Sequence, residues 1–314
     1  MLEVRDLYKN YGSFRAVRGI SFSVDAGEVL GFLGPNGAGK TTTMKIVVGY
    51  MGMSSGVVKV DGLSVAERSR EVRERIGYLP EHAPLYDDMT VIEYLRFMAR
   101  MRGLSGPRRR ERVEHVIGVC SLEAKRRALV STLSKGYRQR VGLAQAIVHD
   151  PKLVILDEPT VGLDPNQIVE IREVLREIGR RNTVILSSHI LSEVEATCRR
   201  VVIIASGSIV AEGTPEELEA RHRDRRVHHL AIDGDAGDLE AALAAMPGLA
   251  DVSRQPDGRF RFQAPADGSF APALAGILAA RGASIRELSS DRPTLEDVFR
   301  DLTAPVPVAA GGEA

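Results

Sequence analysis

The sequence predicts an α/β fold, in which helices cover both faces of a mainly parallel sheet, followed by a small α+β domain. Short apolar runs, such as Val29–Leu33 and Leu153–Leu156, have the pattern of strands buried on both faces. Segments with helical periodicity separate these runs, as crossover helices separate parallel strands. After Arg221, charged residues replace the apolar pattern. With 314 residues, the chain is long enough for two domains.

The predicted strands of the first domain begin with two half-buried segments on either side of a turn at Tyr11-Gly12-Ser13. The later strands are shorter and more continuously apolar. We predict strands at Leu2–Lys9, Phe14–Val24, Val29–Leu33, Val57–Val60, Ile76–Leu79, Leu153–Leu156, Thr183–Leu186 and Val201–Ala205. This first domain should span residues 1–221.

The predicted helices lie between these strands. Thr90 is a suitable N-cap, and Glu93 three residues later completes a capping box. Gly106 and Pro107 end that helix. We predict helices at Gly39–Tyr50, Val91–Met101, Arg108–Cys120, Arg140–Val148 and Asn166–Arg180. The helices between about residues 84 and 150 should form a helical subdomain.

A charged segment, residues 222–227, is predicted to be a surface linker to an accessory domain at residues 228–303. The accessory domain should have the order βαββαβ, which is typical of a ferredoxin-like fold, and a last helix capped by Thr294. The residues from 304 to 314 are small and rich in Pro and Gly, and we expect a disordered tail. The elements are predicted at His228–Ile232, Asp238–Ala245, Ala250–Arg254, Arg259–Gln263, Ala271–Arg281, Ser284–Leu288 and Thr294–Leu302.

Composition excludes several classes of function. The 42 Lys and Arg residues balance 42 Asp and Glu residues, whereas a nucleic-acid-binding protein should carry a basic excess. The two cysteines, Cys120 and Cys198, do not have the spacing of a metal site. No apolar run approaches the ~18–20 residues of a membrane helix, and the first residues lack a signal-peptide core. We therefore expect a cytoplasmic protein that reaches a membrane only through a partner.

The loop after the strand Val29–Leu33 carries the strongest motif. It matches G-x-x-x-x-G-K-[ST] between a strand and a helix, which is the context that a phosphate-binding loop requires. Its glycines allow the backbone N–H groups to converge on phosphate oxygens at a helix N-terminus. Lys40 would contact the β- and γ-phosphates, and the Thr41 hydroxyl would ligate Mg²⁺. The loop residues are Gly34, Pro35, Asn36, Gly37, Ala38, Gly39, Lys40 and Thr41, followed by Thr42.

The strand Leu153–Leu156 ends in two acidic residues, Asp157 and Glu158. Two carboxylates at the end of a buried strand need compensation, which a metal ion supplies. We expect Asp157 to hold Mg²⁺ and Glu158 to act as the general base on the attacking water. The two motifs together leave an ATPase or a GTPase. Because the GTPase tetrapeptide Asn-Lys-x-Asp is missing from the sequence, the ATPase is favoured.

The segment Leu133-Ser134-Lys135-Gly136-Tyr137-Arg138-Gln139-Arg140 resembles the signature Leu-Ser-Gly-Gly-Gln of ATP-binding-cassette (ABC) proteins. The surrounding motifs follow in the family's order over about residues 1–221. The resemblance implies an ABC cassette, with a mainly parallel sheet core, an antiparallel β subdomain and a helical subdomain. It assigns Tyr11 to adenine stacking, Asp164 to the D-loop and His189 to the switch histidine.

In this family two cassettes pair head to tail, so the resemblance implies a second copy of the chain as a partner. Ser134, Lys135 and Gly136 of one copy would then face the ATP of the other. The signature departs from the family at Lys135 and Tyr137, where Gly and Gln are usual. The family's Q-loop glutamine is Glu81 here, whose carboxylate can also ligate Mg²⁺.

The segments Tyr78–Tyr86 and Pro293–Phe299 are similar to those of bacterial type-2 exporters, including gliding-motility-associated subunits. That branch implies a membrane permease on separate chains and a location on the inner face of the membrane. Residues 81–101 would face the permease, although the aromatic residues Tyr94 and Phe97 fit a helix core better. The alternative is a soluble ABC ATPase acting on ribosomes or DNA. The single cassette and the lack of a coiled-coil insertion argue against it.

Overall fold

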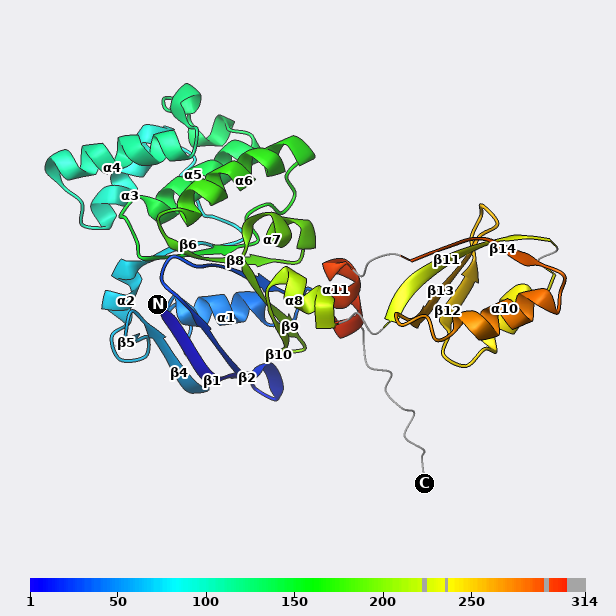
Figure 1. Cartoon of the computed structure of the whole chain (residues 1–314). Coiled ribbons are helices and arrows are strands. Elements are labelled where there is room, and N and C mark those ends of the chain that lie inside the picture. Colours follow the sequence, from blue (N-terminus) through cyan, green and yellow to red (C-terminus); the bar gives the residue numbers. More distant parts are fainter. Residues whose placement is uncertain (222–224, 235–236, 291–293, 304–314) are drawn as a thin grey trace. The chain divides into compact units, whose positions relative to one another are not determined.

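The computed structural model describes residues 1–221, 225–234, 237–290 and 294–303, and these form two compact units (Figure 1). The first unit spans Met1–Thr214, and the second begins at Pro215. The division therefore falls seven residues before the predicted boundary at residue 221. Helix α8 (Pro215–Arg221) belongs to the second unit because it packs on that unit's last helix.

A six-stranded sheet, with the order β10-β9-β3-β8-β7-β6, forms the centre of the first unit. All its neighbouring strands run parallel except the pair β9 and β10 at one edge. Its inner strands β7 and β8 are buried along their whole length, as the apolar runs Leu153–Leu156 and Val184–Leu186 within them predict. The strands are β3 (Val29–Leu33), β6 (Ile76–Leu79), β7 (Leu153–Asp157), β8 (Thr183–Ser188), β9 (Arg200–Ala205) and β10 (Ser208–Gly213).

A second sheet of the first unit is antiparallel and has the order β2-β1-β4-β5. Its strands are β1 (Leu2–Tyr11), β2 (Phe14–Val24), β4 (Ser55–Val60) and β5 (Leu63–Ser64). Helix α1 (Lys40–Val47) contacts strands of both sheets, and one apolar core joins it to them. Helix α1 ends earlier than the predicted Tyr50, because Gly49 adopts a φ of +69° that a helix does not continue through.

The remaining helices of the first unit pack on one another or on strands of its sheets. The capping box of Thr90 and Glu93 is confirmed at the start of α3. The signature helix α5 begins at Lys135 rather than at the predicted Arg140, because the Ser134 hydroxyl caps it by accepting from the Tyr137 amide. The helices are α2 (Ser69–Arg75), α3 (Val91–Met101), α4 (Gly106–Val119), α5 (Lys135–Ile147), α6 (Pro165–Gly179) and α7 (Leu191–Thr197).

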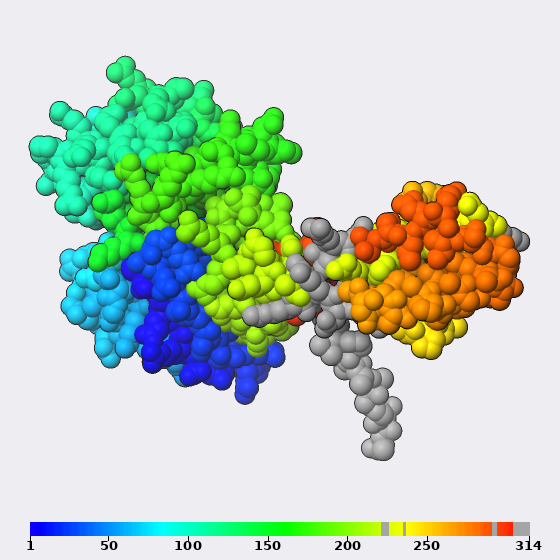
Figure 2. All heavy atoms as spheres, in the orientation of Figure 1, coloured from blue at the N-terminus to red at the C-terminus, as the bar shows by residue number. Residues whose placement is uncertain are grey.

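Figure 2 shows the side chains of α3 and α4 at one end of the first unit and those of β1 and β2 at the other. The aromatic residues of α3 divide between core and surface. Tyr94 is buried and its ring packs edge-on against that of Tyr86, which is exposed. Of the residues predicted to face a permease, Tyr94 thus belongs to the core and Tyr86 to the surface.

The second unit contains an antiparallel sheet with the order β12-β13-β11-β14. Two helices lie between its strands in the sequence order βαββαβ, so the predicted ferredoxin-like arrangement is confirmed. Strand β11 starts at Arg225, so the end of the predicted linker 222–227 is strand, while residues 222–224 lie outside the described residues. The elements are β11 (Arg225–Asp233), α9 (Leu239–Ala244), β12 (Ala250–Arg254), β13 (Phe260–Pro265), α10 (Ala271–Ala279), β14 (Ser284–Ser290) and α11 (Leu295–Thr303).

The second unit has its own apolar core, which includes Phe260 and Phe262 of β13, Leu239 of α9 and Leu274 of α10. The predicted tail at residues 304–314 lies outside the described residues. None of the helices in the described ranges combines the length and apolar character needed to cross a bilayer.

Candidate functional site

The loop between β3 and α1 carries the predicted phosphate-binding residues, and its backbone leaves no room for larger side chains at two glycines. A Cβ on Gly34 would collide with the carbonyl oxygen of Ile204. Gly39, directly before α1, has a φ of +104°, and a Cβ there would lie 2.7 Å from the Ala16 carbonyl oxygen. The loop is thus held against β9 and β2 and leads into the N-terminus of an eight-residue helix.

Lys40, the first residue of α1, is buried and lies at the centre of the site. Its ammonium group donates to the carbonyl oxygen of Gly34 at 2.7 Å and lies 3.2 Å from Oε1 of Glu158. A buried ammonium needs such acceptors because an uncompensated charge in the interior is costly. The contacts with the loop therefore fix the position of a cation at the helix N-terminus.

Asp157 is completely buried at the end of β7. Its Oδ1 accepts hydrogen bonds from the hydroxyls of Ser187 at 2.7 Å and Thr41 at 3.3 Å. Its Oδ2 is buried and has no hydrogen-bond partner within the described part of the chain. Burial raises the pKa of Asp157, an effect that the two hydrogen bonds oppose. Ser187 was not among the residues predicted from the sequence, because a serine inside a buried strand gives no local signal.

An orphaned carboxylate oxygen beside a threonine hydroxyl fits a hard divalent cation, which prefers oxygen ligands. Asp157 and Thr41 are therefore suitable ligands for Mg²⁺. Glu81 is exposed, and its negative charge is among the causes that raise the pKa of Asp157. Within the described ranges, no group of three or more His, Cys, Asp or Glu side chains is arranged to hold a metal ion.

Glu158 directly follows β7 and has a φ of +51°, a conformation that side-chain-bearing residues rarely adopt. Its amide donates to the Ser187 carbonyl oxygen at 3.0 Å, which ties this backbone to β8. Backbone strain of this kind persists where surrounding contacts impose it, often at functional sites. The carboxylate is buried and lies 2.7 Å from Nδ1 of His189, which follows β8. One carboxylate thus contacts both Lys40 and His189.

A single open pocket of about 640 Å³ brings most of the predicted site residues together. Tyr11, at the end of β1, forms one wall, and its half-exposed ring lies beside Met51 and under the Lys9 ammonium. Phe14, Ala16 and Val161 also line the pocket, although the sequence gave no reason to select them. The predicted residues that line it are Tyr11, Asn36, Gly37, Gly39, Lys40, Thr41, Thr42, Glu81, Glu158 and His189.

The signature residues do not line this pocket. Ser134 caps α5, and Gly136 lies beside the Gln167 side chain of α6, since a Cβ on Gly136 would lie 2.7 Å from its Oε1. Asp164 caps α6, because its carboxylate accepts from the Gln167 amide at 2.9 Å. Lys135 and Asp164 also lie outside the lining of the pocket. One copy of the chain therefore gathers only part of the predicted nucleotide-binding residues.

Two family models match the chain. The one described as "ABC transporter" matches residues 17–161, and the one described as "ATP-binding protein DrrA1-3-like, C-terminal domain" matches residues 213–303. The chain is 34% identical to the linearmycin resistance ATP-binding protein of Bacillus subtilis, over 96% of this chain and 98% of that protein. It is 40% identical to the Nod factor export ATP-binding protein I of Burkholderia orbicola, over 69% of this chain and 72% of that protein.

Solved structures agree with the sequence comparisons. An ATP-binding subunit of an ABC transporter is 33% identical and superposes with a TM-score of 0.64, over 71% of this chain and 93% of that chain. The cbiO1 protein of Clostridium perfringens, part of the ABC transporter complex cbiONQ, is 31% identical with a TM-score of 0.64, over 70% of this chain and 91% of that chain.

Proposed function

Because this chain belongs to the ABC transporter family of ATP-binding proteins, we propose that it is the ATP-hydrolysing subunit of a bacterial exporter. The observation that carries the proposal is the meeting of Lys40, Glu158 and His189 in one pocket at the N-terminus of α1. Relatives named for export and for drug resistance match most of the chain, which supports export and gives no support to an ATPase acting on ribosomes or DNA.

The pocket accommodates ATP with the phosphates at the loop of residues 34–41 and the base at Tyr11. The loop amides and the N-terminus of α1 present donors and partial positive charge to the phosphates. Lys40 is already fixed at the start of α1, so its ammonium need only turn from Glu158 toward the γ-phosphate. The exposed ring of Tyr11 offers a flat surface on which adenine stacks.

Glu158 is placed to act on the water that attacks the γ-phosphorus. It accepts the proton of that water as the new P–O bond forms and the bond to the β-phosphate oxygen breaks, which releases ADP and phosphate. Its contact with His189 Nδ1 orients the carboxylate, and the other ring nitrogen of His189 is left for the γ-phosphate. The strained backbone of Glu158 keeps the carboxylate at the end of β7, where this geometry is available.

We propose that Thr41, Asp157 and Glu81 hold Mg²⁺ in the ATP complex. Bound there, the ion would neutralise charge on the β- and γ-phosphates. The hydrogen bond from Ser187 orients the Asp157 carboxylate and leaves Oδ2 for a ligand or its water. Glu81 replaces the usual glutamine and adds a negative charge at this edge of the pocket, which should strengthen the binding of Mg²⁺.

The site is proposed to be completed by a second copy of the chain. Ser134 and Gly136 lie at the N-terminus of the 13-residue helix α5, whose amide groups form an anion-binding end. Lys135 adds a positive charge, and Asp164 of the neighbouring loop would border the nucleotide. Placed across the pocket of another copy, these residues would contact its γ-phosphate. ATP would thus hold two chains together until it is hydrolysed.

We further propose that the dimer lies on the inner face of the membrane beneath a permease on separate chains. The transported compound would then pass through that partner. No helix in the described ranges is long and apolar enough to cross a membrane. The proposal is tested by phosphate release from ATP by the purified chain, alone and with its membrane partner in lipid discs. Hydrolysis that depends on Glu158 and rises with the partner supports it. A chain that releases no phosphate in either setting contradicts it.

A further inference from the structure

An arginine-rich surface of the first unit lies on α3 and at the start of α4, and it shares no residue with the nucleotide pocket. Residues 96–112 contain seven arginines and a single acidic residue, although the whole chain has no formal net charge. Four of these arginines, Arg96, Arg108, Arg109 and Arg110, are exposed or half-buried, and we call them the arginine patch. Three of the four line a hollow of about 810 Å³ to which both helices contribute.

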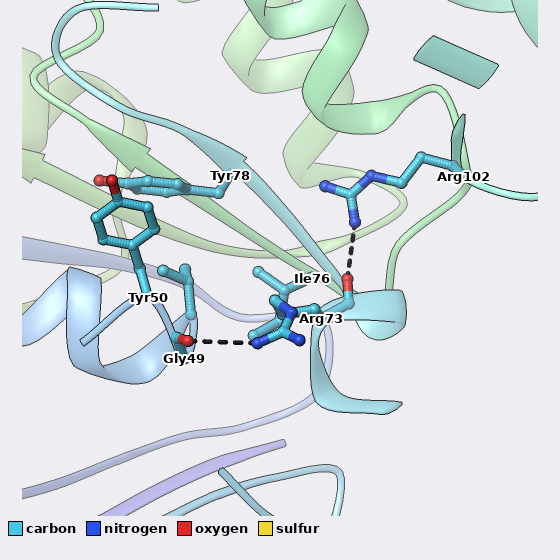
Figure 3. Close-up of a pocket in the computed structure, with 7 residues that line it drawn as sticks. Gly49, Tyr50, Arg73, Ile76, Tyr78 and Arg102 are labelled. Carbon is cyan, nitrogen blue, oxygen red and sulfur yellow. Dashed lines mark hydrogen bonds between the residues drawn. The ribbon is translucent and has the colours of Figure 1, made fainter. Parts of the chain in front are cut away.

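The four arginines of the patch form no ion pair and no hydrogen bond with their side chains among the residues that the structure describes. Two other arginines of the same stretch do have partners. Arg102 donates to the Arg73 carbonyl oxygen at 2.9 Å (Figure 3), and Arg112 pairs with Asp150 at 3.3 Å. The patch therefore presents positive charge that no carboxylate of the described chain contacts.

The acidic residues in and beside the patch do not cancel this charge. Glu114 lines the hollow but pairs with Arg126 at 2.8 Å. Glu93 of α3 accepts from the Thr90 amide at 2.9 Å in the capping box. Glu111 is the remaining acid in the lining, against three arginines. The hollow thus keeps a net positive charge.

The start of α4 is an unfavourable place for arginines. The N-terminus of a helix carries partial positive charge, which favours acidic side chains in the first turn. Helix α4 has no acidic residue there and carries three consecutive arginines directly after Gly106 and Pro107. These charges reduce the stability of the helix, so folding does not account for them. Departures from local rules of this kind are expected at functional sites.

The chemistry of the hollow favours phosphate groups at a lipid surface. Guanidinium groups bind phosphate oxygens through paired hydrogen bonds. Apart from Gly106 and Pro107, only arginine and glutamate side chains line the hollow. A protein partner would require an apolar and aromatic centre from which charges are depleted. A layer of lipid headgroups needs no such centre, because its negative charge attracts basic side chains directly.

From these observations we infer that the arginine patch binds the phosphate headgroups of anionic lipids at the inner face of the membrane. The inference rests on the proposed function, which places the chain beneath a permease. Arg96 lies within residues 81–101, which are expected to face that permease, so the patch would contact the bilayer beside it. Each arginine near an anionic surface should raise the affinity for the membrane by about fivefold.

The test uses the purified full chain and two kinds of lipid vesicle, one of phosphatidylcholine and one that also contains phosphatidylglycerol. Sedimentation with the vesicles measures the bound fraction. The wild type should bind the anionic vesicles more tightly by a factor of about 100 or more. The difference should shrink as the salt concentration rises from about 0.05 M to about 0.5 M, because salt screens exposed charges. Exchange of Arg108, Arg109 and Arg110 for Gln should weaken binding to the anionic vesicles by about 100-fold.

The matched control exchanges Arg176, Arg180 and Arg181 of α6 for Gln. These arginines are also exposed, but each pairs with a glutamate. The control loses the same charge and should bind the anionic vesicles almost as the wild type does. Both triple variants should retain basal ATP hydrolysis, because none of the six arginines lines the nucleotide pocket. Thermal unfolding should show no loss of stability when residues 108–110 are exchanged, because repulsion at the start of α4 is removed.

Equal binding of the wild type to the two kinds of vesicle, or undiminished binding when residues 108–110 are exchanged, overturns the inference. Binding to double-stranded DNA through these arginines, with neither kind of vesicle bound, also overturns it. These results leave the proposed function intact, because ATP hydrolysis by the isolated chain is measured without lipid. A chain that binds the anionic vesicles through the arginine patch but releases no phosphate from ATP contradicts the proposed function alone.

Discussion

The ammonium group of Lys40 lies 3.2 Å from Oε1 of Glu158, and both side chains are buried. The same carboxylate contacts His189 through its other oxygen at 2.7 Å. The proposed base is therefore held by two of the groups that would bind the γ-phosphate. We propose that the phosphate of arriving ATP competes for Lys40 and so frees Glu158 to accept a proton from water. Binding of the substrate thus prepares the base.

Lys40→Ala should weaken ATP binding by about 100-fold, because a charge-assisted hydrogen bond to phosphate is lost and Glu158 remains beside the phosphates without its cation. Titration calorimetry with ATP and Mg²⁺ measures the change. Lys45→Ala, on the same helix but outside the pocket, is the matched control and should bind as the wild type does. Undiminished affinity of the Lys40 variant would show that the loop of residues 34–41 does not bind the phosphates of ATP.

Tyr11→Ala should weaken ATP binding by about tenfold, because stacking of a base on an aromatic ring contributes about 1–3 kcal/mol. Tyr11→Phe retains the ring and should bind almost as the wild type does, although the contact of the hydroxyl with Met51 is lost. Fluorescence titration with a labelled ATP analogue compares the three proteins. Equal affinities for all three would place the adenine elsewhere in the pocket.

His149 makes the first unit sensitive to acid. Burial, and then the charge of Arg102, lower the pKa of His149 to about 4. Since the unfolded-state pKa is about 6.5, the native state resists protonation, and stability falls as the pH drops from 6.5 toward 4. His149→Gln keeps an N–H donor for the Ile76 carbonyl oxygen but does not titrate.

Between pH 7.5 and pH 5 the wild type should therefore lose about 2 kcal/mol more unfolding free energy than His149→Gln. Urea denaturation followed by circular dichroism at both pH values gives the two losses. Parallel losses in the two proteins would show that His149 is not responsible for acid sensitivity.

A chain shortened to residues 1–226 should fold and retain basal ATP hydrolysis, because the first unit has its own apolar core and contains the whole pocket. Phosphate release per folded chain is the measurement, with circular dichroism as the check on folding. A shortened chain that remains unfolded would show that the second unit is needed to stabilise the first, and that the predicted domain boundary is misplaced.

The sequence predicts those site residues best that belong to a motif contiguous in the chain. The loop at Lys40 and the acids after β7 are recognisable because a strand, a turn and a charged residue are contiguous. Ser187 could not be selected in this way, because its role arises from the pairing of β7 with β8, which places it opposite Asp157. The start of α5 was predicted five residues too late. Ser134 was assigned to the signature, and its second role as the N-cap of α5 was not recognised.

The fold was predicted well where periodicity is strong. The parallel strands and the βαββαβ order of the second unit follow from apolar runs and breaks. Helix α2 was missed because it has seven residues, of which only Val72 is buried, so it carries no apolar stripe.

The central claim is that each chain holds half of a nucleotide site and that ATP joins two chains. Glu158→Gln should still bind ATP, because Lys40 is present and no longer pairs with a carboxylate. The variant should not hydrolyse ATP, because the proposed general base is missing. The ATP-bound dimer should then accumulate. Glu173→Gln, an exposed exchange on α6, is the matched control and should turn over normally. Addition of Ser134→Glu to the Glu158 variant should prevent the dimer, because it places a negative charge opposite the partner's γ-phosphate.

The most direct measurement is the molar mass of Glu158→Gln by light scattering after size exclusion, with and without ATP and Mg²⁺. We expect the mass of one 34.1 kDa chain without nucleotide and twice that mass with it. A variant that stays at the mass of one chain with ATP bound, or that hydrolyses ATP at the wild-type rate, would contradict the account.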